Sequence, residues 1–386
     1  MIKSIRIKNF RALEDFIVDP LGRVNLIVGK NNSGKSSVLE ALRIYAGNAQ
    51  RDLLEQIATE HDEKTWIRET DLDQLDATLP FEDFFSGRRY FADDKIGIEI
   101  GEVSSEQSLL SIQHGFYIEL REKVDGESGE PAFRIRRKRV TAADIDSIED
   151  ERSNHALFIQ KGDRSTMLRL DTSNRMLRGV TADLPGTMPC SIIPTKFVSI
   201  DELADEWDKI GLTEHQHVVK AALQIISDDF EDIIFVRRDD TTNSARRSFS
   251  RTAKVKLSKN DRPVPLNSLG DGMLRVLQLA LKLFPARGGM LLIDEFENGL
   301  HYSVQEKVWQ LIFEQANKLD IQVFATTHSW DCVESFARVA EARQDVDGVL
   351  FRVGRSVRTS DHGRVIATVF DKRQLFAISQ ADVEVR

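Results

Sequence analysis

The pattern GxxxxGKS at residues 29–36 constrains this chain more than any other feature. It consists of Gly29-Lys30-Asn31-Asn32-Ser33-Gly34-Lys35-Ser36, follows the apolar run 24–28, and precedes Val38, Leu39 and Leu42 at helical spacing. Strand, glycine-rich loop and helix in this order are the context in which such a loop cradles phosphate. The alternative is a glycine turn with an exposed lysine, and the flanking strand and helix argue against it.

The residue types in this loop suit an anion site. Glycines at both ends permit backbone angles that let successive N–H groups point at one anion, and the following helix N-terminus adds partial positive charge. Lys35 can reach the β- and γ-phosphates, and the Ser36 hydroxyl can ligate Mg²⁺. We therefore expect an ATP and Mg²⁺ site. Its candidate binding residues are Gly29, Asn31, Asn32, Ser33, Gly34, Lys35, Ser36 and Ser37.

Length and composition indicate a soluble globular chain. Its 386 residues are 41% hydrophobic and 30% charged, which suits two to three domains. No apolar run approaches the ~20 residues that span a bilayer, and the first residues lack a signal-peptide core. Cys190 and Cys332 lack metal-site spacing, so we expect a cytoplasmic protein without a membrane partner. The net charge of −9 excludes a uniformly basic coat but not a local basic patch.

The periodicity of the chain predicts an α/β fold with a parallel sheet, because strands and helices alternate from residue 192 onward. Residues 51–94 are mixed and acidic, and residues 141–190 show no clear pattern. The expected helices are 36–45, 201–210, 214–226, 272–284, 302–318, 330–341 and a short one at the C-terminus. The expected strands are 2–8, 12–18, 23–28, 96–100, 110–120, 132–136, 192–200, 233–236, 253–257, 289–294, 321–326, 348–353 and 364–370, with a turn at 126–129.

The apolar run 289–293 ends in Asp294 and Glu295, which resembles the second half of an ATP site. Buried parallel strands are continuously apolar, and ligands bind at their carboxyl ends. Asp294 is placed to hold Mg²⁺, directly or through water, while Glu295 can deprotonate an attacking water. The alternative is an ordinary strand that happens to end in acidic residues, and the presence of the phosphate loop argues against it.

Two further segments complete the pattern. Ser268, Gly270 and Asp271 precede a helix, where small residues and free N–H groups form a second anion site or simply cap the helix. His328 follows the next expected strand after the Asp294-Glu295 strand. There it could donate a hydrogen bond to a γ-phosphate oxygen or to the attacking water, although a lone histidine is usually structural.

These segments, in this order, resemble an ABC-type ATPase head of the SMC/RecF/OLD group. The matching parts are the hairpin with Ile7-Lys8-Asn9-Phe10-Arg11, the Walker A loop, the Ser268-Leu269-Gly270-Asp271 signature, Walker B Asp294-Glu295 and the Thr327-His328 switch. The segment 294–301 is most similar to bacterial OLD-like ATPases, many of them linked to phage defence. The resemblance implies a mixed or parallel sheet with flanking helices and an N-terminal antiparallel β-subdomain. The head would comprise 1–50 and 190–386, with a variable α+β insertion at 51–189.

The resemblance also implies a mechanism that needs two copies. Two heads pack head-to-tail, and Ser268, Gly270 and Asp271 of one cap the γ-phosphate on the other's Walker A loop, with 298–301 at the interface. By resemblance, Lys35 and Ser36 bind phosphate and Mg²⁺, Asp294 holds the metal, Glu295 is the base and His328 senses the γ-phosphate. Arg11 resembles an arginine near the nucleotide in SMC-like heads.

The chain departs from OLD nucleases in one respect. Asp345-Val346-Asp347 has the form of a TOPRIM carboxylate pair, but too little sequence follows it for that domain. We therefore expect an ATPase without nuclease activity of its own. It would be a dimerising switch, or a higher homo-oligomer, that signals to a separate effector such as a nuclease or toxin.

A RecF-like DNA-binding ATPase in repair or recombination is the alternative reading. Arg134, Arg136 and Lys138 of the basic stretch Arg134–Arg139 would share one strand face, and the second basic group extends through Arg246–Lys256. Such charged stretches are more often simply solvated, or face an acidic protein partner. A transporter motor would need a membrane partner, to which nothing in the sequence points.

Overall fold

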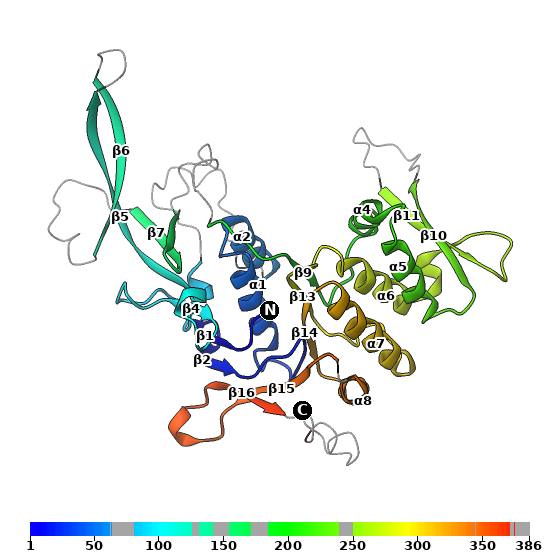
Figure 1. Cartoon of the computed structure of the whole chain (residues 1–386). Coiled ribbons are helices and arrows are strands. Elements are labelled where there is room, and N and C mark those ends of the chain that lie inside the picture. Colours follow the sequence, from blue (N-terminus) through cyan, green and yellow to red (C-terminus); the bar gives the residue numbers. More distant parts are fainter. Residues whose placement is uncertain are drawn as a thin grey trace.

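A computed structural model describes the chain at residues 1–61, 63, 81–125, 131–141, 154–170, 184–238, 250–343, 345–370 and 374. Figure 1 shows a central sheet between two arms. One arm is built from N-terminal and middle strands around helices α1 and α2, and the other carries helices α4–α7 with strands β10 and β11. The predicted α/β fold is confirmed.

The central sheet contains the strand that leads into the phosphate loop. Its order is β16-β15-β3-β14-β13-β9, and all neighbours are parallel except β15 and β16. Every residue of β3, β13 and β14 is buried, which explains why these strands are continuously apolar rather than alternating. The bounds are β3 Val24–Val28, β9 Cys190–Ile193, β13 Met290–Ile293, β14 Gln322–Thr327, β15 Gly348–Arg355 and β16 Val365–Phe370.

The helices lie close to the predicted ranges except α2, for which no helix was predicted, and one strand is shorter than predicted. We expected a strand over 192–200, but β9 ends at Ile193 and α4 begins at Ile200. Pro194 has no N–H for a strand ladder, and the Ser199 side chain accepts a hydrogen bond from Glu202 N, as a helix cap does. The bounds are α1 Lys35–Ala46, α2 Arg51–Glu60, α4 Ile200–Ile210, α5 His215–Gln224, α6 Asp271–Lys282, α7 Tyr302–Lys318 and α8 Trp330–Ala342.

A second, seven-stranded sheet grows from the N-terminal hairpin. Its order is β2-β1-β4-β5-β7-β8, with β6 paired to β5, and its described pairs are antiparallel. Ile7 of β1 lies opposite Phe16 on one side and Ile100 on the other, so strands from the middle of the chain continue the sheet of the N-terminal hairpin. The bounds are β1 Ile5–Phe10, β2 Leu13–Val18, β4 Ile98–Gly101, β5 Leu110–Asp125, β6 Pro131–Val140, β7 Asn154–Lys161 and β8 Arg164–Arg169.

The middle of the chain differs most from the sequence prediction. The strand predicted over 110–120 is longer in the structure, because β5 runs to Asp125, and β7 and β8 lie in a stretch for which we predicted nothing. The turn at 126–129 and the terminal helix lie outside the described residues, apart from Gln374. The division into head and insertion stays a prediction. A small third sheet, β10-β11-β12, comprises Phe230–Arg238, Ser250–Leu257 and Val264–Pro265.

The central sheet separates two hydrophobic cores. Along β3, Leu26 and Val28 pack into the core under α6, α7 and α8, whereas Ile27 packs into the core shared with α1 and the N-terminal sheet. Alternate residues of a strand point to opposite faces, so both faces of β3 are covered. Trp309 of α7 stacks on Phe296 just after β13, with ring centroids 3.8 Å apart. This packing fixes the strand ends that carry the candidate site.

Candidate nucleotide-binding site

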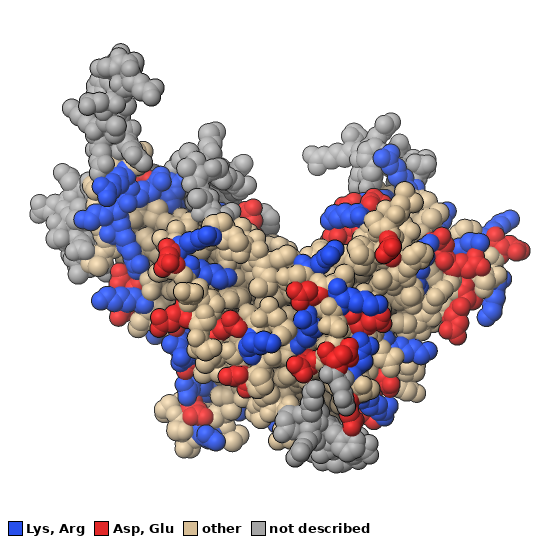
Figure 2. Space-filling view, in the orientation of Figure 1, with Lys and Arg blue, Asp and Glu red and all other residues tan. Residues whose placement is uncertain are grey.

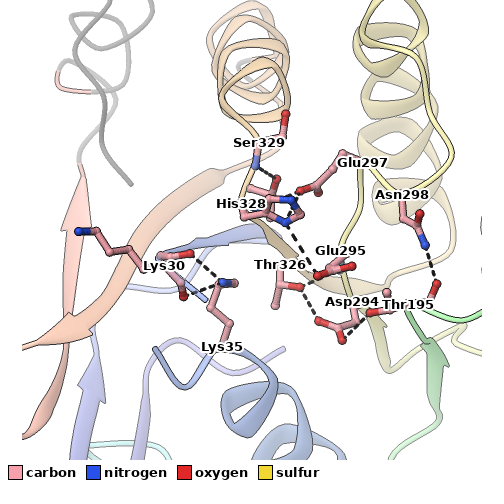
Figure 3. Close-up of polar contacts among 12 residues, drawn as sticks. Lys30, Lys35, Thr195, Asp294, Glu295, Glu297, Asn298, Thr326, His328 and Ser329 are labelled. Carbon is pink, nitrogen blue, oxygen red and sulfur yellow. Dashed lines mark hydrogen bonds and ion pairs between the residues drawn. The ribbon is translucent and has the colours of Figure 1, made fainter. Parts of the chain in front are cut away.

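Three of the predicted motifs meet at one edge of the central sheet. Strand β14 lies between β3 and β13 and is parallel to both, so the carboxyl ends of all three point the same way. The phosphate loop follows β3, Asp294 and Glu295 follow β13, and His328 follows β14. Figure 3 shows these side chains converging. Motifs about 260–300 residues apart in the sequence thus form one site, as ligand sites in α/β sheets do.

Lys35 forms hydrogen bonds within the phosphate loop itself. Lys35 Nζ donates hydrogen bonds to the carbonyl oxygens of Gly29, at 2.7 Å, and Lys30, at 3.0 Å. Burial lowers the pKa of Lys35, and the charges of Asp294, Glu295 and Glu297 act in the opposite direction. The ammonium therefore sits within reach of the acidic side of the site.

Gly29 is required by close backbone packing. A Cβ at residue 29 would lie 2.4 Å from the carbonyl oxygen of Val353 on β15 and 2.7 Å from Ser33 Oγ. Ser33 Oγ is buried and, within the ranges that the structure describes, has no hydrogen-bond partner. Gly34 precedes α1 with φ +103°. The loop thus has the backbone geometry that its glycine pattern predicts.

Both carboxylate oxygens of Asp294 are held by threonines from neighbouring strand ends. Oδ1 accepts a hydrogen bond from Thr326 Oγ1 at 2.6 Å, and Oδ2 accepts one from Thr195 Oγ1 at 2.9 Å. Thr326 Oγ1 also accepts the backbone N–H of Glu295 at 2.8 Å. We did not predict Thr195 or Thr326 as site residues. Their position at the ends of strands beside β13 is the signal that could have revealed them.

Glu295 and His328 face each other across the ends of β13 and β14. Glu295 Oε1 lies 3.9 Å from His328 Nδ1, and their side chains are 36% and 50% exposed. Glu295 adopts a left-handed backbone with φ +47°, which is uncommon for a residue with a side chain. Such backbone geometry is found preferentially at functional sites.

Two charged residues that we did not predict complete this corner. Glu297 Oε1 lies 3.0 Å from His328 Nδ1 and accepts the backbone N–H of His328 at 2.9 Å. Arg275 of α6 is fully buried and donates to the carbonyl oxygens of Pro194, Asp294 and Glu295 at 2.7–2.8 Å. Burial lowers the pKa of Arg275 to about 10, although the nearby carboxylates oppose this. The signal that could have revealed Arg275 in the sequence is its place among the apolar residues of a helix.

The signature segment lies at the exposed start of α6. Ser268 Oγ donates to the carbonyl oxygen of Pro265 at 2.6 Å, and Gly270 has φ +89° with open space around it. A Cβ on Gly299 would lie 3.3 Å from the carbonyl oxygen of Asp271, so this segment packs beside residues 298–301. Asn298 is anchored by a hydrogen bond to the carbonyl oxygen of Thr195 at 2.6 Å.

Arg11 is held by two carboxylates. Its Nε lies 2.6 Å from Glu40 of α1, and its two terminal nitrogens donate to Glu63 at 2.6 and 3.0 Å. Burial opposes the charge, but Glu63 and Glu40 outweigh it and raise the pKa of Arg11. The guanidinium also lies over the ring of Phe84, 5.2 Å from its centroid. The expected proximity of Arg11 to a nucleotide stays a prediction.

Within the described ranges, no three His, Cys, Asp or Glu side chains lie together as a metal site. None of the helices in those ranges is both long and apolar enough to cross a membrane.

Comparison with known proteins agrees with the resemblance drawn from the motifs. Residues 24–331 match the family described as "AAA domain, putative AbiEii toxin, Type IV TA system". An ATP/GTP phosphatase of Helicobacter pylori is 25% identical over 352 residues, 88% of each chain. An OLD nuclease of Thermus scotoductus is 44% identical over 48 residues, which are 12% of this chain and 9% of that one.

A solved structure of an SMC head bound to the C-winged helix domain of ScpA covers 98% of this chain and 99% of its own, with 15% identity and a TM-score of 0.47. The family match spans well over half of the chain. The chain therefore belongs to the family of AAA domains described as putative AbiEii toxin, Type IV TA system, and is an ATPase with a head of the SMC/RecF/OLD type.

Proposed function

We propose that this chain is a molecular switch in which two copies close head-to-tail around ATP and hydrolysis separates them. The observation that carries the proposal is the convergence of Lys35, Asp294, Glu295 and His328 from three separate strand ends (Figure 3). These side chains can bind a triphosphate, hold a metal, accept a proton and stabilise an oxyanion, which together make a hydrolytic site.

Glu295 is the proposed general base. Its side chain is 36% exposed and its backbone N–H donates a hydrogen bond to Thr326 Oγ1, so the carboxylate can receive a proton from a water molecule. His328 would hydrogen-bond a γ-phosphate oxygen or the attacking water, and Lys35 would leave its loop carbonyls to bind phosphate.

The donor set fits Mg²⁺ bound together with ATP. This ion commonly uses one or two carboxylates and completes its shell with phosphate oxygens and water. Asp294 supplies a carboxylate oriented by Thr195 and Thr326, and Ser36 lies exposed at the start of α1. The ion would neutralise phosphate charge, while Asp294 and Ser36 would hold it.

Ser268, Gly270 and Asp271 are proposed to act on the ATP held by a second copy. This fits their exposed place at the N-terminus of α6 and their packing beside Gly299, so residues 298–301 would share the interface. Helix N-termini favour anions such as a γ-phosphate. A homodimer, or a higher homo-oligomer built from the same contact, would follow.

The output of the switch is proposed to reach a separate effector, such as a nuclease or toxin, in cytoplasmic phage defence. The family description and the OLD nuclease relative support this proposal. Strands β5, β6 and β7 extend away from the central sheet (Figure 1), which suits them to contact a partner.

The Glu295→Gln variant tests the catalytic assignment. We expect ATP binding to persist and phosphate release to fall by roughly 10²- to 10⁴-fold, the usual contribution of a general base. Trapped ATP should then increase the dimer fraction, measured as mass in solution. Glu314→Gln, at an exposed ion pair within α7, is the matched control. Wild-type turnover in Glu295→Gln would refute the assignment.

DNA binding is the second candidate, and one basic group favours it. Figure 2 shows Lys and Arg side chains gathered over the arm of β5 and β6, where residues 136–139 are exposed. Arg137 is paired with Glu119, which reduces the free charge. In the other group, Arg251 contacts three aspartates of α4, Asp201, Asp205 and Asp208, and Lys256 contacts Glu231, whereas Arg246 lies outside the described residues.

The salt dependence of duplex DNA binding tests this candidate. Contacts to phosphates release counterions, so affinity should fall steeply between 50 and 200 mM salt, by roughly 10-fold or more for a few contacts. Lys138→Glu should reduce the affinity and the salt slope together. Binding that is absent, or that does not change with salt, would exclude DNA as the partner of β6.

A further inference from the structure

Glu297 links the ends of strands β13 and β14 at the candidate site. Its Oε1 accepts the backbone N–H of His328 at 2.9 Å and lies 3.0 Å from Nδ1 of the same residue. The Glu297 side chain is only 11% exposed, against 36% for Glu295. One carboxylate therefore contacts both the main chain and the ring of His328, as Figure 3 shows.

The other carboxylate oxygen of Glu297 lowers the stability of the folded chain. Oε2 is buried and has no hydrogen-bond partner in the described part of the chain. A buried polar atom without a partner costs free energy, so a residue selected only for stability would rarely be a carboxylate here. The charge of Glu297 does act on Lys35 and Arg275, whose pKa values it raises against the effect of burial.

A carboxylate beside one imidazole nitrogen determines the role of the other. With Glu297 next to Nδ1, the proton is favoured on Nδ1, and Nε2 becomes the nitrogen that is free to face a ligand. The second hydrogen bond, to the backbone N–H of His328, fixes the strand end from which the ring projects. Ring direction and tautomer are thus set by one side chain.

Two carboxylates flank this ring, and their surroundings differ. Glu295 is half-exposed, lies 3.9 Å from Nδ1 and can exchange protons with water. The Glu297 side chain is largely buried and lies closer to the ring. Two carboxylates in such different environments can have separate roles.

We propose that Glu297 is a positioning residue for ATP hydrolysis, which holds His328 in the tautomer and orientation that present Nε2 to the γ-phosphate or the attacking water. The inference rests on the proposed role of His328 in turnover. It concerns the rate of hydrolysis and not the affinity for ATP, because Glu297 contacts His328 and not the phosphate loop.

The test is a double-mutant cycle on the full chain. Glu297→Ala should lower kcat for ATP by roughly 10- to 100-fold, as removal of a carboxylate that orients a histidine typically does, with little change in KM. His328→Ala should have a loss at least as large, and the double variant should be no slower than His328→Ala alone. Glu297→Gln retains an acceptor for the His328 N–H and should lose less. Glu314→Ala on the exposed end of α7 is the control.

Additive losses in the cycle would overturn the inference, because Glu297 would then act independently of His328. Unchanged kcat in either Glu297→Ala or His328→Ala would overturn it as well. If Glu297→Ala fails to fold, the cycle is run with Glu297→Gln and His328→Ala, and additivity has the same meaning. The proposed function fails on a separate result, namely wild-type turnover in Glu295→Gln.

Discussion

Replacing Arg275 by Met should destabilise the whole chain and not only slow its chemistry. The guanidinium of Arg275 is fully buried and donates three hydrogen bonds, to the carbonyl oxygens of Pro194, Asp294 and Glu295. Met fills a similar volume without any donor. The variant therefore leaves three inward-facing carbonyl groups without this partner at the ends of β9 and β13.

The loss of stability can be worked from these contacts. A hydrogen bond from a charged donor contributes about 1.5–3 kcal/mol, so three contribute roughly 5–9 kcal/mol. Burial lowers the pKa of Arg275 well below its usual value, to about 10. At 1.36 kcal/mol for each pH unit, the buried charge offsets roughly 3 kcal/mol of that gain. The free energy of unfolding should therefore fall by roughly 2–6 kcal/mol, and the usual cost of breaking a buried charged network, about 3–5 kcal/mol, lies within that range.

Urea denaturation measures this loss. With a slope near 3 kcal/mol per molar urea, the unfolding midpoint should fall by about 1–2 M. Arg338→Met is the control, since Arg338 is exposed on α8 and its described ion pairs are with two glutamates, Glu306 and Glu334. A midpoint for Arg275→Met within about 0.2 M of the wild-type value would refute the reasoning, because the buried hydrogen bonds of this charged donor would then contribute no net stability.

Two further predictions concern the loop and the middle sheet. Gly29→Ala should lower the melting temperature and weaken ATP binding, because its Cβ would lie 2.4 Å from the Val353 carbonyl oxygen; unchanged binding by calorimetry would contradict this. Burial, and to a lesser extent the charge of His155, lowers the pKa of His114 to about 4. As the pH falls below about 6.5, this histidine is therefore protonated in the unfolded chain before it is protonated in the folded one. The free energy of unfolding should fall over this range, by roughly 3 kcal/mol at pH 4. In His114→Gln this pH dependence should be smaller, and equal urea-midpoint profiles would contradict the prediction.

The sequence was sufficient to predict the central sheet and the strand ends of the site. β3, β13 and β14 are continuously apolar because both faces are covered, and each is followed directly by a polar motif. The middle of the chain could not be predicted in the same way. In β7, buried and partly exposed residues follow one another without strict alternation, so its period of two is weak in the sequence.

The sequence could not predict which residues pair with the motif residues, because this pairing depends on tertiary contacts. Arg11 pairs with Glu40 and Glu63, which are far from it in the sequence. Similarly, the second basic group includes Arg251, whose neighbours on α4 are three aspartates. A list of charges along the chain does not show which of them are already paired in the fold.

Thr326, Arg275 and Glu297 escaped prediction for a common reason: each binds the main chain of a predicted residue. Thr326 accepts the N–H of Glu295, Arg275 donates to the carbonyls of Asp294 and Glu295, and Glu297 accepts the N–H of His328. Main-chain groups carry no sequence signature, so no pattern identifies their partners. The two classes should also respond differently to substitution. Replacing a half-exposed side chain such as Glu295 changes the rate alone, whereas replacing a buried residue that binds the main chain changes rate and stability together.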